Sequence, residues 1–310
     1  MAAHAGCQAL AHCPGPDTEV PERDLATRLA RFATDALIEE AHATPKPALV
    51  DRRGSGAHRD LNLAVMERSA YALEPTFAAL ARASQGKRPS AALRTELAAI
   101  GRAGEAAMMR ATQGSNAHRG AIWIVGLLVA GATISGEVAG MQSMAAESIC
   151  STAAHIACFP DRDAPLAPSN GTRVRMRYGV GGARREAQEG FPHVLRIGLP
   201  ALHAARRRGI GESAARIDTL LAIMTTLDDT CLLHRAGVPA LTAAKSGAEE
   251  VLTLGGSSTP SGQAALARLE SRLLAFNASP GGAADLLAAT LFMDRLAPSC
   301  ADGRTQAWSI

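Results

Sequence analysis

Residues 120–136, GAIWIVGLLVAGATISG, form a run of seventeen uncharged residues near the middle of the chain. The run is short for a membrane span and contains Gly126 and Gly131. Helices that are apolar on all sides are typical of protein interiors as well as of membranes. We therefore interpret these residues as a buried helix and expect no membrane association.

The composition around this run favours helices. The chain of 310 residues is rich in Ala and Leu, has 3% aromatic residues and lacks the alternation of β-branched residues that strands need. We predict an all-α fold in a single large multi-helix domain, with polar loops rich in Gly and Pro converging on one site. The expected boundaries are a disordered tail over 1–20, a catalytic domain over 21–298 and a tail over 299–310. A segment rich in Pro, Gly and Arg at 159–183 is a possible junction of two helical halves.

Spacing and breakers predict individual helices. Apolar residues spaced by three and four predict a helix that starts near Pro21 and ends at Glu40. A second helix follows Asp60 as its cap and is bent or broken at Pro75, and a third starts at Ser90. Residues 213–227 predict a helix that carries an Asp-Asp pair on its last turn, and 255–262 predict a flexible link.

The charge distribution indicates a phosphate-bearing partner. The net charge is +3 and 29 of the 32 cationic residues are arginine, which suits bidentate phosphate recognition. Residues 162–208 contain ten arginines against Asp163, Glu186 and Glu189. No zinc-finger spacing, aromatic RNA-binding motif or long basic helix is present, so we expect no nucleic-acid partner.

The six cysteines show no CxxC pair, and the N-terminus lacks the features of a signal peptide. Free thiols in a reducing cytoplasm are therefore the expectation. Cys7 and Cys13, with His4 and His12 nearby, form either a metal-binding tract or part of a disordered tail.

The first polar cluster, residues 39–60, EEAHATPKPALVDRRGSGAHRD, has the composition of a functional site. Pro45 and Pro47 end the preceding helix, and an irregular loop punctuated by glycines follows. It brings together carboxylates, cations and His58. A solvated surface loop held by salt bridges explains the composition equally well.

Three further polar segments precede or follow helices. Residues 113–120 come immediately before the apolar run, where free N–H groups favour an anion, although Asn116 can simply be an N-cap. Residues 178–186 form a Gly-rich loop suited to phosphate, with neither P-loop nor GxGxxG spacing. Residues 279–287 form a glycine turn before a helix, where Asp285 either complements the helix dipole or takes part in a site.

Four strings, in order along the chain, resemble one family. They are TPKPALVDRRGSGAHRD (44–60), GSNAHRGAIW (114–123), YGVGGARREAQEGFP (178–192) with DDTCLLHRAG (228–237), and SPGGAADLLAATLFMDRL (279–296). The family is triphosphoribosyl-dephospho-CoA synthase. The sequence of residues 228–235 resembles the malonate decarboxylase branch of this family more than its citrate lyase branch.

The sequence departs from the family pattern at three places. Ala48 stands where the family commonly has glycine, which makes the backbone after Pro47 less free. Ala117, His118 and Arg119 replace a frequent Thr-His-Lys. Cys231 stands where the citrate branch often has asparagine, which puts a polar role there in doubt.

The resemblance implies an all-α cytoplasmic enzyme. It would join the triphosphoribosyl group of ATP to the 2′-hydroxyl of 3′-dephospho-CoA and release adenine. The product would become the prosthetic group of a malonate decarboxylase acyl carrier protein after a separate transferase step. Mg²⁺ is expected with ATP, and no redox cofactor is expected.

The expected site residues fall into three groups. Cleavage of an N-glycosidic bond has an oxocarbenium-like transition state, which needs an acid, a base and negative charge. We assign acid–base work to Asp51 or Asp60, substrate positioning to His58, and Mg²⁺ binding to Asp228 and Asp229. Expected substrate-binding residues are Glu40, Thr44, Lys46, Asn116, His118, Arg119, Gly182, Arg184, Glu186, His234, Arg235, Gly281, Gly282 and Asp285.

Two other functions remain open from the sequence. The same carboxylates suit a metal-dependent nucleotide or ADP-ribosyl hydrolase that uses water as the acceptor. A non-catalytic helical protein that binds nucleotides or phosphate is the alternative from a different class.

Overall fold

The computed structural model describes residues 24–139, 145–165, 167 and 169–297. Within these ranges the protein is all-α, with no strand apart from an isolated bridge between Asp51 and Gly54. The helices are α1 (Leu25–His42), α2 (Leu63–Ser84), α3 (Ala91–Ala111), α4 (Arg119–Ala139), α5 (Ala146–Cys158), α6 (Asn170–Tyr178), α7 (Gly182–Gln188), a π-helical turn (Val194–Gly198), α8 (Leu199–Arg207), α9 (Glu212–Thr226), α10 (Thr230–Thr253), α11 (Pro260–Ala275) and α12 (Gly281–Leu296). The all-α prediction is confirmed.

Helix α4 contains the apolar run and lies in the core. It packs against α1, α2, α3, α5, α7 and α12. It is also the one helix in the described part of the chain that is long and apolar enough to cross a membrane, over Arg119–Gly136, and 78% of that window is buried inside the protein. The buried environment agrees with the interpretation of residues 120–136 as a core helix.

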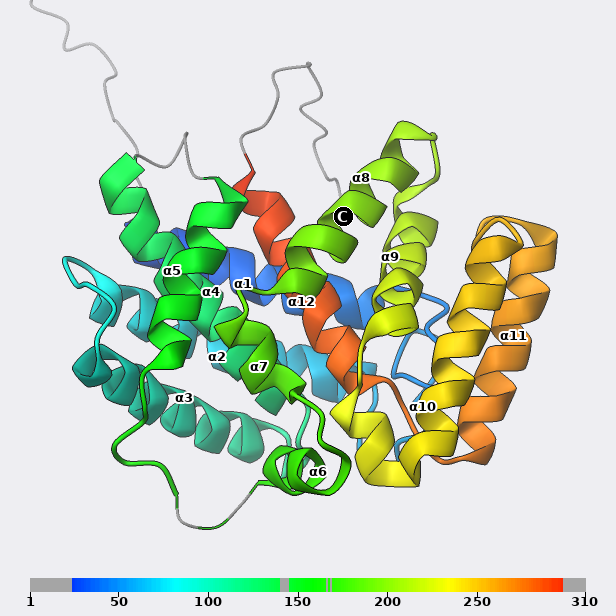
Figure 1. Cartoon of the computed structure of the whole chain (residues 1–310), viewed down its shortest axis with the longest axis horizontal. Helices are drawn as coiled ribbons and strands as arrows, with labels where there is room; N and C mark the ends of the chain where they lie inside the picture. Colours follow the sequence, from blue (N-terminus) through cyan, green and yellow to red (C-terminus); the bar gives the residue numbers. More distant parts are fainter. Residues whose placement is uncertain (1–23, 140–144, 166, 168, 298–310) are drawn as a thin grey trace, which may run out of the picture.

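Helix α12 joins the two sides of the molecule (Figure 1). It contacts α1 and α4 on one side and α9 and the π-helical turn on the other. Consecutive helices elsewhere form packed pairs, such as α1 with α2, α4 with α5, and α10 with α11. One hydrophobic cluster runs from α1 to α12, so the described helices share one core. The division into halves near 159–183 stays a prediction.

Several predicted boundaries need correction. Asn62, not Asp60, caps α2, because its side chain accepts a hydrogen bond from the backbone N–H of Val65. Helix α2 runs through Pro75 without a break. Helix α1 continues past Glu40 to His42, whereas Ser90 caps α3 as predicted. Pro21, like Cys7 and Cys13, lies outside the described residues.

The Asp-Asp pair lies at a helix start, not at a helix end. Helix α9 ends at Thr226, and Asp229 is the N-cap of α10. A carboxylate is favourable there because the helix dipole is positive at its N-terminus. The expected link at 255–262 is a shorter turn, since α11 starts at Pro260 and Asp218 accepts a hydrogen bond from the Ser257 N–H at 2.7 Å.

Candidate active site

Asp51 organises the loop between α1 and α2. Its buried carboxylate accepts hydrogen bonds from the backbone N–H groups of Lys46, at 2.9 Å, and Arg53, at 2.7 Å. The Arg53 guanidinium binds the same carboxylate and continues to Glu270 of α11. The peptide bond before Pro45 is cis. Asp51 therefore holds the loop in shape, and Arg53 links it to α11.

The backbone after Pro47 is constrained, as the departure at Ala48 predicts. Ala48 has a φ of 57°, in the left-handed region that glycine favours. Its carbonyl accepts a hydrogen bond from Ala57 at 2.9 Å. A Cβ at Gly56 would lie 2.4 Å from the same carbonyl oxygen. The two ends of the loop thus pack directly against each other.

Glu40 and Lys46 form an ion pair inside the protein. The Lys46 ammonium lies 2.5 Å from Glu40 Oε1 and 2.7 Å from the Glu40 carbonyl oxygen. Both side chains are almost fully buried. A desolvated pair of this kind is stable only when both charges are present. Lys46 is therefore already neutralised by a protein carboxylate.

His118 lies near this pair and is buried. Its Nδ1 is 2.7 Å from the Ser69 hydroxyl of α2, while its Nε2 has no hydrogen-bond partner among the described residues. Burial, assisted by the positive charge of Lys46, lowers the pKa of His118 to about 3. The imidazole is neutral at physiological pH.

His58 connects the loop to α10 and α12. Its Nε2 lies 2.9 Å from the Ser279 hydroxyl, and its Nδ1 lies 3.2 Å from the Arg235 guanidinium. Arg235 also donates to the Ala57 carbonyl. Burial and Arg235 lower the pKa of His58 to about 4, against the opposing effect of Asp60. Asp60 itself is exposed.

Asp229 joins the first turns of two helices. Its Oδ1 accepts hydrogen bonds from the N–H groups of Cys231 and Leu232 of α10, and its Oδ2 accepts one from Ala283 of α12. Burial raises the pKa of the Asp229 carboxyl, and these backbone donors act in the opposite direction. A Cβ at Gly282 would lie 3.1 Å from this carboxylate.

Asp285 joins α12 to the start of α4. It accepts a hydrogen bond from the N–H of Ala121, and a Cβ at Gly120 would lie 1.9 Å from its Oδ2. Burial raises the pKa of the Asp285 carboxyl well above its ordinary value, and the charges of Glu40 and Asp229 raise it further. Burial and these neighbouring carboxylates therefore favour the protonated form of Asp285.

The start of α10 lies beside α7 and α12. A Cβ at Gly182 would lie 3.1 Å from Thr230, and a Cβ at Gly281 would lie 3.0 Å from the Cys231 Sγ. Burial raises the pKa of the Cys231 thiol well above its ordinary value. Cys231 is accordingly a neutral thiol. The first turns of α4, α10 and α12 and the 44–60 loop thus surround one group of acidic side chains, Glu40, Asp229 and Asp285.

Other predicted residues have different partners. Asn116 Oδ1 accepts from the Arg119 N–H, which agrees with its interpretation as an N-cap, and the Arg119 guanidinium pairs with Glu105. Glu186 binds both the backbone and the imidazole of His193. The remaining ones are Thr44, which hydrogen-bonds to the His42 carbonyl, and two exposed residues, Arg184 and His234.

The proposed metal ligands do not share a common set of contacts. Asp228 is exposed and pairs with Lys245 at 2.7 Å, whereas the oxygens of Asp229 are bound by backbone N–H groups. Among the described residues, no group of three or more His, Cys, Asp and Glu side chains is arranged to hold a metal ion. The pair does not fit a shared Mg²⁺ site in this conformation.

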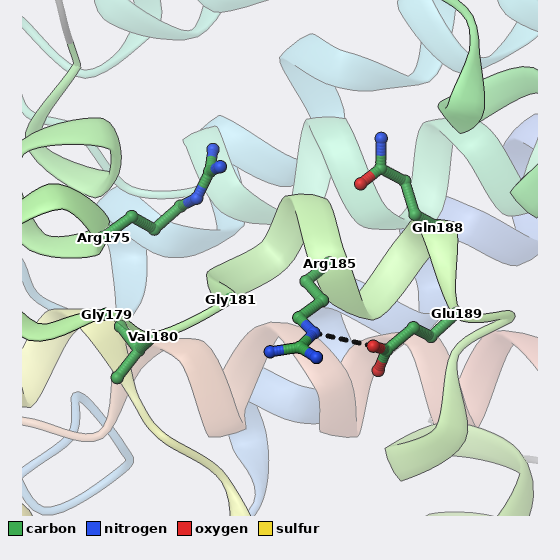
Figure 2. Close-up of a pocket in the computed structure, with 7 residues that line it drawn as sticks. All are labelled: Arg175, Gly179, Val180, Gly181, Arg185, Gln188 and Glu189. Atoms are coloured by element: carbon green, nitrogen blue, oxygen red, sulfur yellow. Dashed lines mark hydrogen bonds and ion pairs between the residues drawn. The ribbon is translucent and has the colours of Figure 1, made fainter.

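A surface cavity of about 380 Å³ lies beside the predicted Gly-rich loop (Figure 2). It is lined by Arg175 of α6, the backbone of residues 179–181, and Arg185, Gln188 and Glu189. Arg185 is turned toward Glu189, 2.6 Å away, whereas the Arg175 guanidinium makes no hydrogen bond or ion pair with a described residue. The loop therefore borders an open cavity lined by two arginines and one glutamate, and its role in phosphate binding stays a prediction.

Sequence reasoning missed residues that long-range packing brings to the site. Ser69 is a polar residue within a helix and belongs to no motif, and Thr230 lies in the string 228–237 but was given no role. Arg94 has a detectable signal, because it lies on the apolar stripe of α3 with Leu97, Gly104 and Met108. A charged residue in such a stripe is seldom buried without a function or a partner.

The fold brings buried carboxylates together at helix N-termini, and arginines without a carboxylate partner lie nearby. These features define a class of all-α proteins suited to phosphate-bearing ligands. The model of one such family, ATP:dephospho-CoA triphosphoribosyl transferase, matches residues 26–302. The chain belongs to this family.

Three relatives support the assignment. A "2-(5''-triphosphoribosyl)-3'-dephosphocoenzyme-A synthase" of Klebsiella pneumoniae is 54% identical over 87% of this chain and 94% of its own length. Proteins with the same name, preceded by "Probable", are 54% identical in Pseudomonas paraeruginosa (89% and 93% covered) and 52% identical in Azotobacter vinelandii (90% and 94% covered). No solved structure matches significantly.

Proposed function

We propose that the protein transfers the 5-triphosphoribosyl group of ATP to the 2′-hydroxyl of 3′-dephospho-CoA and releases adenine. Family membership and the names of the relatives support this activity. The structural observation that carries it is the meeting of Glu40, Asp229 and Asp285 at the first turns of α4, α10 and α12. Such a site combines carboxylates for an oxocarbenium-like transition state with helix N-termini for phosphate.

We assign the general acid to Asp285. Adenine departs more easily when it is protonated, and the raised pKa of the Asp285 carboxyl favours the protonated form that a general acid needs. Asp60, an exposed carboxylate close enough to influence His58, is the proposed base for the incoming hydroxyl. Asp51, whose oxygens are already bound by Lys46 and Arg53, would order the loop. Neutral His58 would position the substrate through Ser279 and Arg235.

The phosphate groups would contact the cationic groups that lack a carboxylate partner. Arg175 lines the open cavity, and Arg184 lies next to it on α7. Lys46 suits this role less than the sequence suggests, because Glu40 neutralises it. We assign to Lys46 the orientation of Glu40 instead.

Mg²⁺ would accompany the ATP phosphates, where it offsets their charge. Asp228 is the exposed carboxylate available to it, whereas Asp229 is bound to the backbone. We assign no catalytic step to the metal. An unchanged Mg²⁺ requirement in Asp228→Asn would remove Asp228 from this role.

The sequence of residues 228–235 favours a role in malonate decarboxylase biogenesis over one in citrate lyase biogenesis. We place this role in the cytoplasm. In this proposal a separate transferase delivers the product to the acyl carrier protein. Growth on malonate and on citrate in a strain that lacks this protein separates the two pathways.

The activity is tested by chromatography with mass detection on purified protein given ATP, Mg²⁺ and 3′-dephospho-CoA, with each component omitted in turn. Equal amounts of adenine and of a triphosphoribosyl adduct, only in the complete mixture, are expected. Adenine without the adduct would indicate a hydrolase. Tight ATP binding without either product would indicate a binding protein.

A further inference from the structure

Arg94 is a buried cation without a protein acceptor. Only 8% of its surface is exposed, and its guanidinium carbon lies 4.4 Å from the centre of the Trp123 ring. Its guanidinium forms no ion pair or hydrogen bond with any residue in the described part of the chain, and its Nε is buried without an acceptor. Buried arginines normally have an acceptor, because desolvation of an unpaired charge is costly.

The surroundings of Arg94 are positive. Burial lowers the pKa of its guanidinium, and Arg184 and Arg102 lower it further, while Asp161 acts in the opposite direction. Asp161 is already bound to Arg102 at 2.6 Å. The one carboxylate that raises the pKa of Arg94 is thus already paired with Arg102, and two further guanidinium groups act on Arg94 in the opposite direction.

Trp123 connects this cluster to the candidate active site. Its indole Nε1 donates to the carbonyl of Ala183 at 3.4 Å, directly before Arg184. Trp123 also lies on the first turns of α4, three residues after Gly120, whose backbone packs against the Asp285 carboxyl. The face of Trp123 that Arg94 covers holds the guanidinium plane in one orientation.

We propose that Arg94 and Arg184 form a phosphate-binding subsite that takes the polyphosphate group of a substrate. Planar guanidinium groups bind phosphate oxygens through paired hydrogen bonds, and a ligand anion would supply the charge that the protein lacks. The group is the triphosphate of ATP or the diphosphate of 3′-dephospho-CoA, which share this chemistry. The choice between them rests on the proposed function, but the existence of the subsite does not.

The first test measures binding of inorganic tripolyphosphate by calorimetry. Arg94→Met retains the aliphatic stem over Trp123, and Arg184→Gln changes an exposed residue that should not affect folding. Each variant should bind roughly 10- to 100-fold more weakly than the wild type, the range expected for lost charged hydrogen bonds. The matched control is Arg268→Gln on α11, which breaks an exposed ion pair with Glu250 of α10. This variant should bind tripolyphosphate normally.

The melting temperature provides a second readout. Without ligand, Arg94→Met should melt at a higher temperature than the wild type, because it removes an uncompensated buried charge. A lower melting temperature together with unchanged tripolyphosphate binding would show that Arg94 is only a packing residue and would overturn the proposal. If Arg94→Met fails to fold, unchanged binding by Arg184→Gln overturns it equally.

Steady-state kinetics distinguish the two sources of polyphosphate. A rise in KM for ATP alone assigns the subsite to the triphosphate, and a rise for 3′-dephospho-CoA alone assigns it to the diphosphate. Active variants with both KM values and tripolyphosphate binding unchanged would refute the subsite. Weakened tripolyphosphate binding in a protein that makes no adduct would leave the subsite intact and refute the proposed function.

Discussion

The carboxylate of Asp229, at the start of α10, accepts a hydrogen bond at 2.9 Å from the backbone N–H of Ala283, at the start of α12. The two residues are 54 positions apart in the sequence. The same carboxylate also caps its own helix. One side chain therefore fixes the relative position of two helices whose first turns border the candidate active site.

Replacement of Asp229 by alanine should reduce the free energy of unfolding by about 2–4 kcal/mol, because two helices lose a cap at once. Asp228→Ala is the matched control and should cost less than about 1 kcal/mol, since it removes only an exposed pair with Lys245. Urea unfolding measures both. Equal losses in the two variants would show that Asp229 is not the link between the helices.

Asp285→Asn should separate catalysis from stability. If Asp285 is the acid, kcat should fall about 100-fold or more. The unfolding free energy should hold or rise, because a neutral amide replaces a carboxyl whose charged form is disfavoured by burial and by Glu40 and Asp229. The raised pKa of Asp285 also predicts a pH dependence: the stabilisation that Asp285 contributes should decrease as the pH rises from its pKa in the unfolded state toward its pKa in the folded state. This pH dependence of the unfolding free energy should disappear in the variant. Retained turnover would exclude Asp285 as the acid.

Gly120→Ala should displace Asp285. The added Cβ would lie 1.9 Å from the Asp285 Oδ2, so we expect a loss of about 1–3 kcal/mol in stability and at least a tenfold loss of kcat. Gly211→Ala, where a Cβ meets nothing within 4 Å, is the control. Normal kcat in the Gly120 variant would mean that the position of Asp285 is not critical.

The buried pair of Glu40 and Lys46 should show strong energetic coupling. Lys46→Met alone leaves the Glu40 carboxylate buried without its cation, which should cost about 3–5 kcal/mol. Glu40→Leu combined with Lys46→Met should recover most of that loss, because no charge remains buried. A double-mutant cycle by chemical denaturation measures the coupling. Simple additivity of the two changes would contradict a buried pair.

His118 should make stability depend on acid pH. Its pKa is about 3 in the folded protein and about 6.5 when unfolded. The unfolded state thus binds more protons between these values, so stability is full above pH 6.5 and decreases as the pH falls toward 3. His118→Asn, whose amide can still contact Ser69, should remove on the order of 2 kcal/mol of the difference between pH 7 and 4.5. Parallel stability profiles for the two proteins would mean that the pKa of His118 is not lowered by folding.

Local patterns were sufficient for the helices but not for their ends. The Ser90 cap and the apolar stripe of α3 are encoded within a few residues, and so is the buried character of α4. The cap of α2 was assigned to Asp60 instead of Asn62, because two capping residues stand two positions apart and only packing selects one. The end of α9 was missed for a similar reason, since Leu227 continues the apolar spacing beyond the helix.

The sequence alone determined the helical class, the central apolar helix, the polar segments of the site and the family resemblance, because each depends on neighbouring residues or on short strings. Tertiary structure decided which charges are buried and which partners they have. Lys46 lies inside with Glu40, Asp228 and Asp229 have separate partners, and Arg94 has none among the described residues. Desolvation and pairing arise from contacts between helices that are distant in the sequence. These two effects raise the pKa of Asp285 and leave the Arg94 guanidinium without a carboxylate partner.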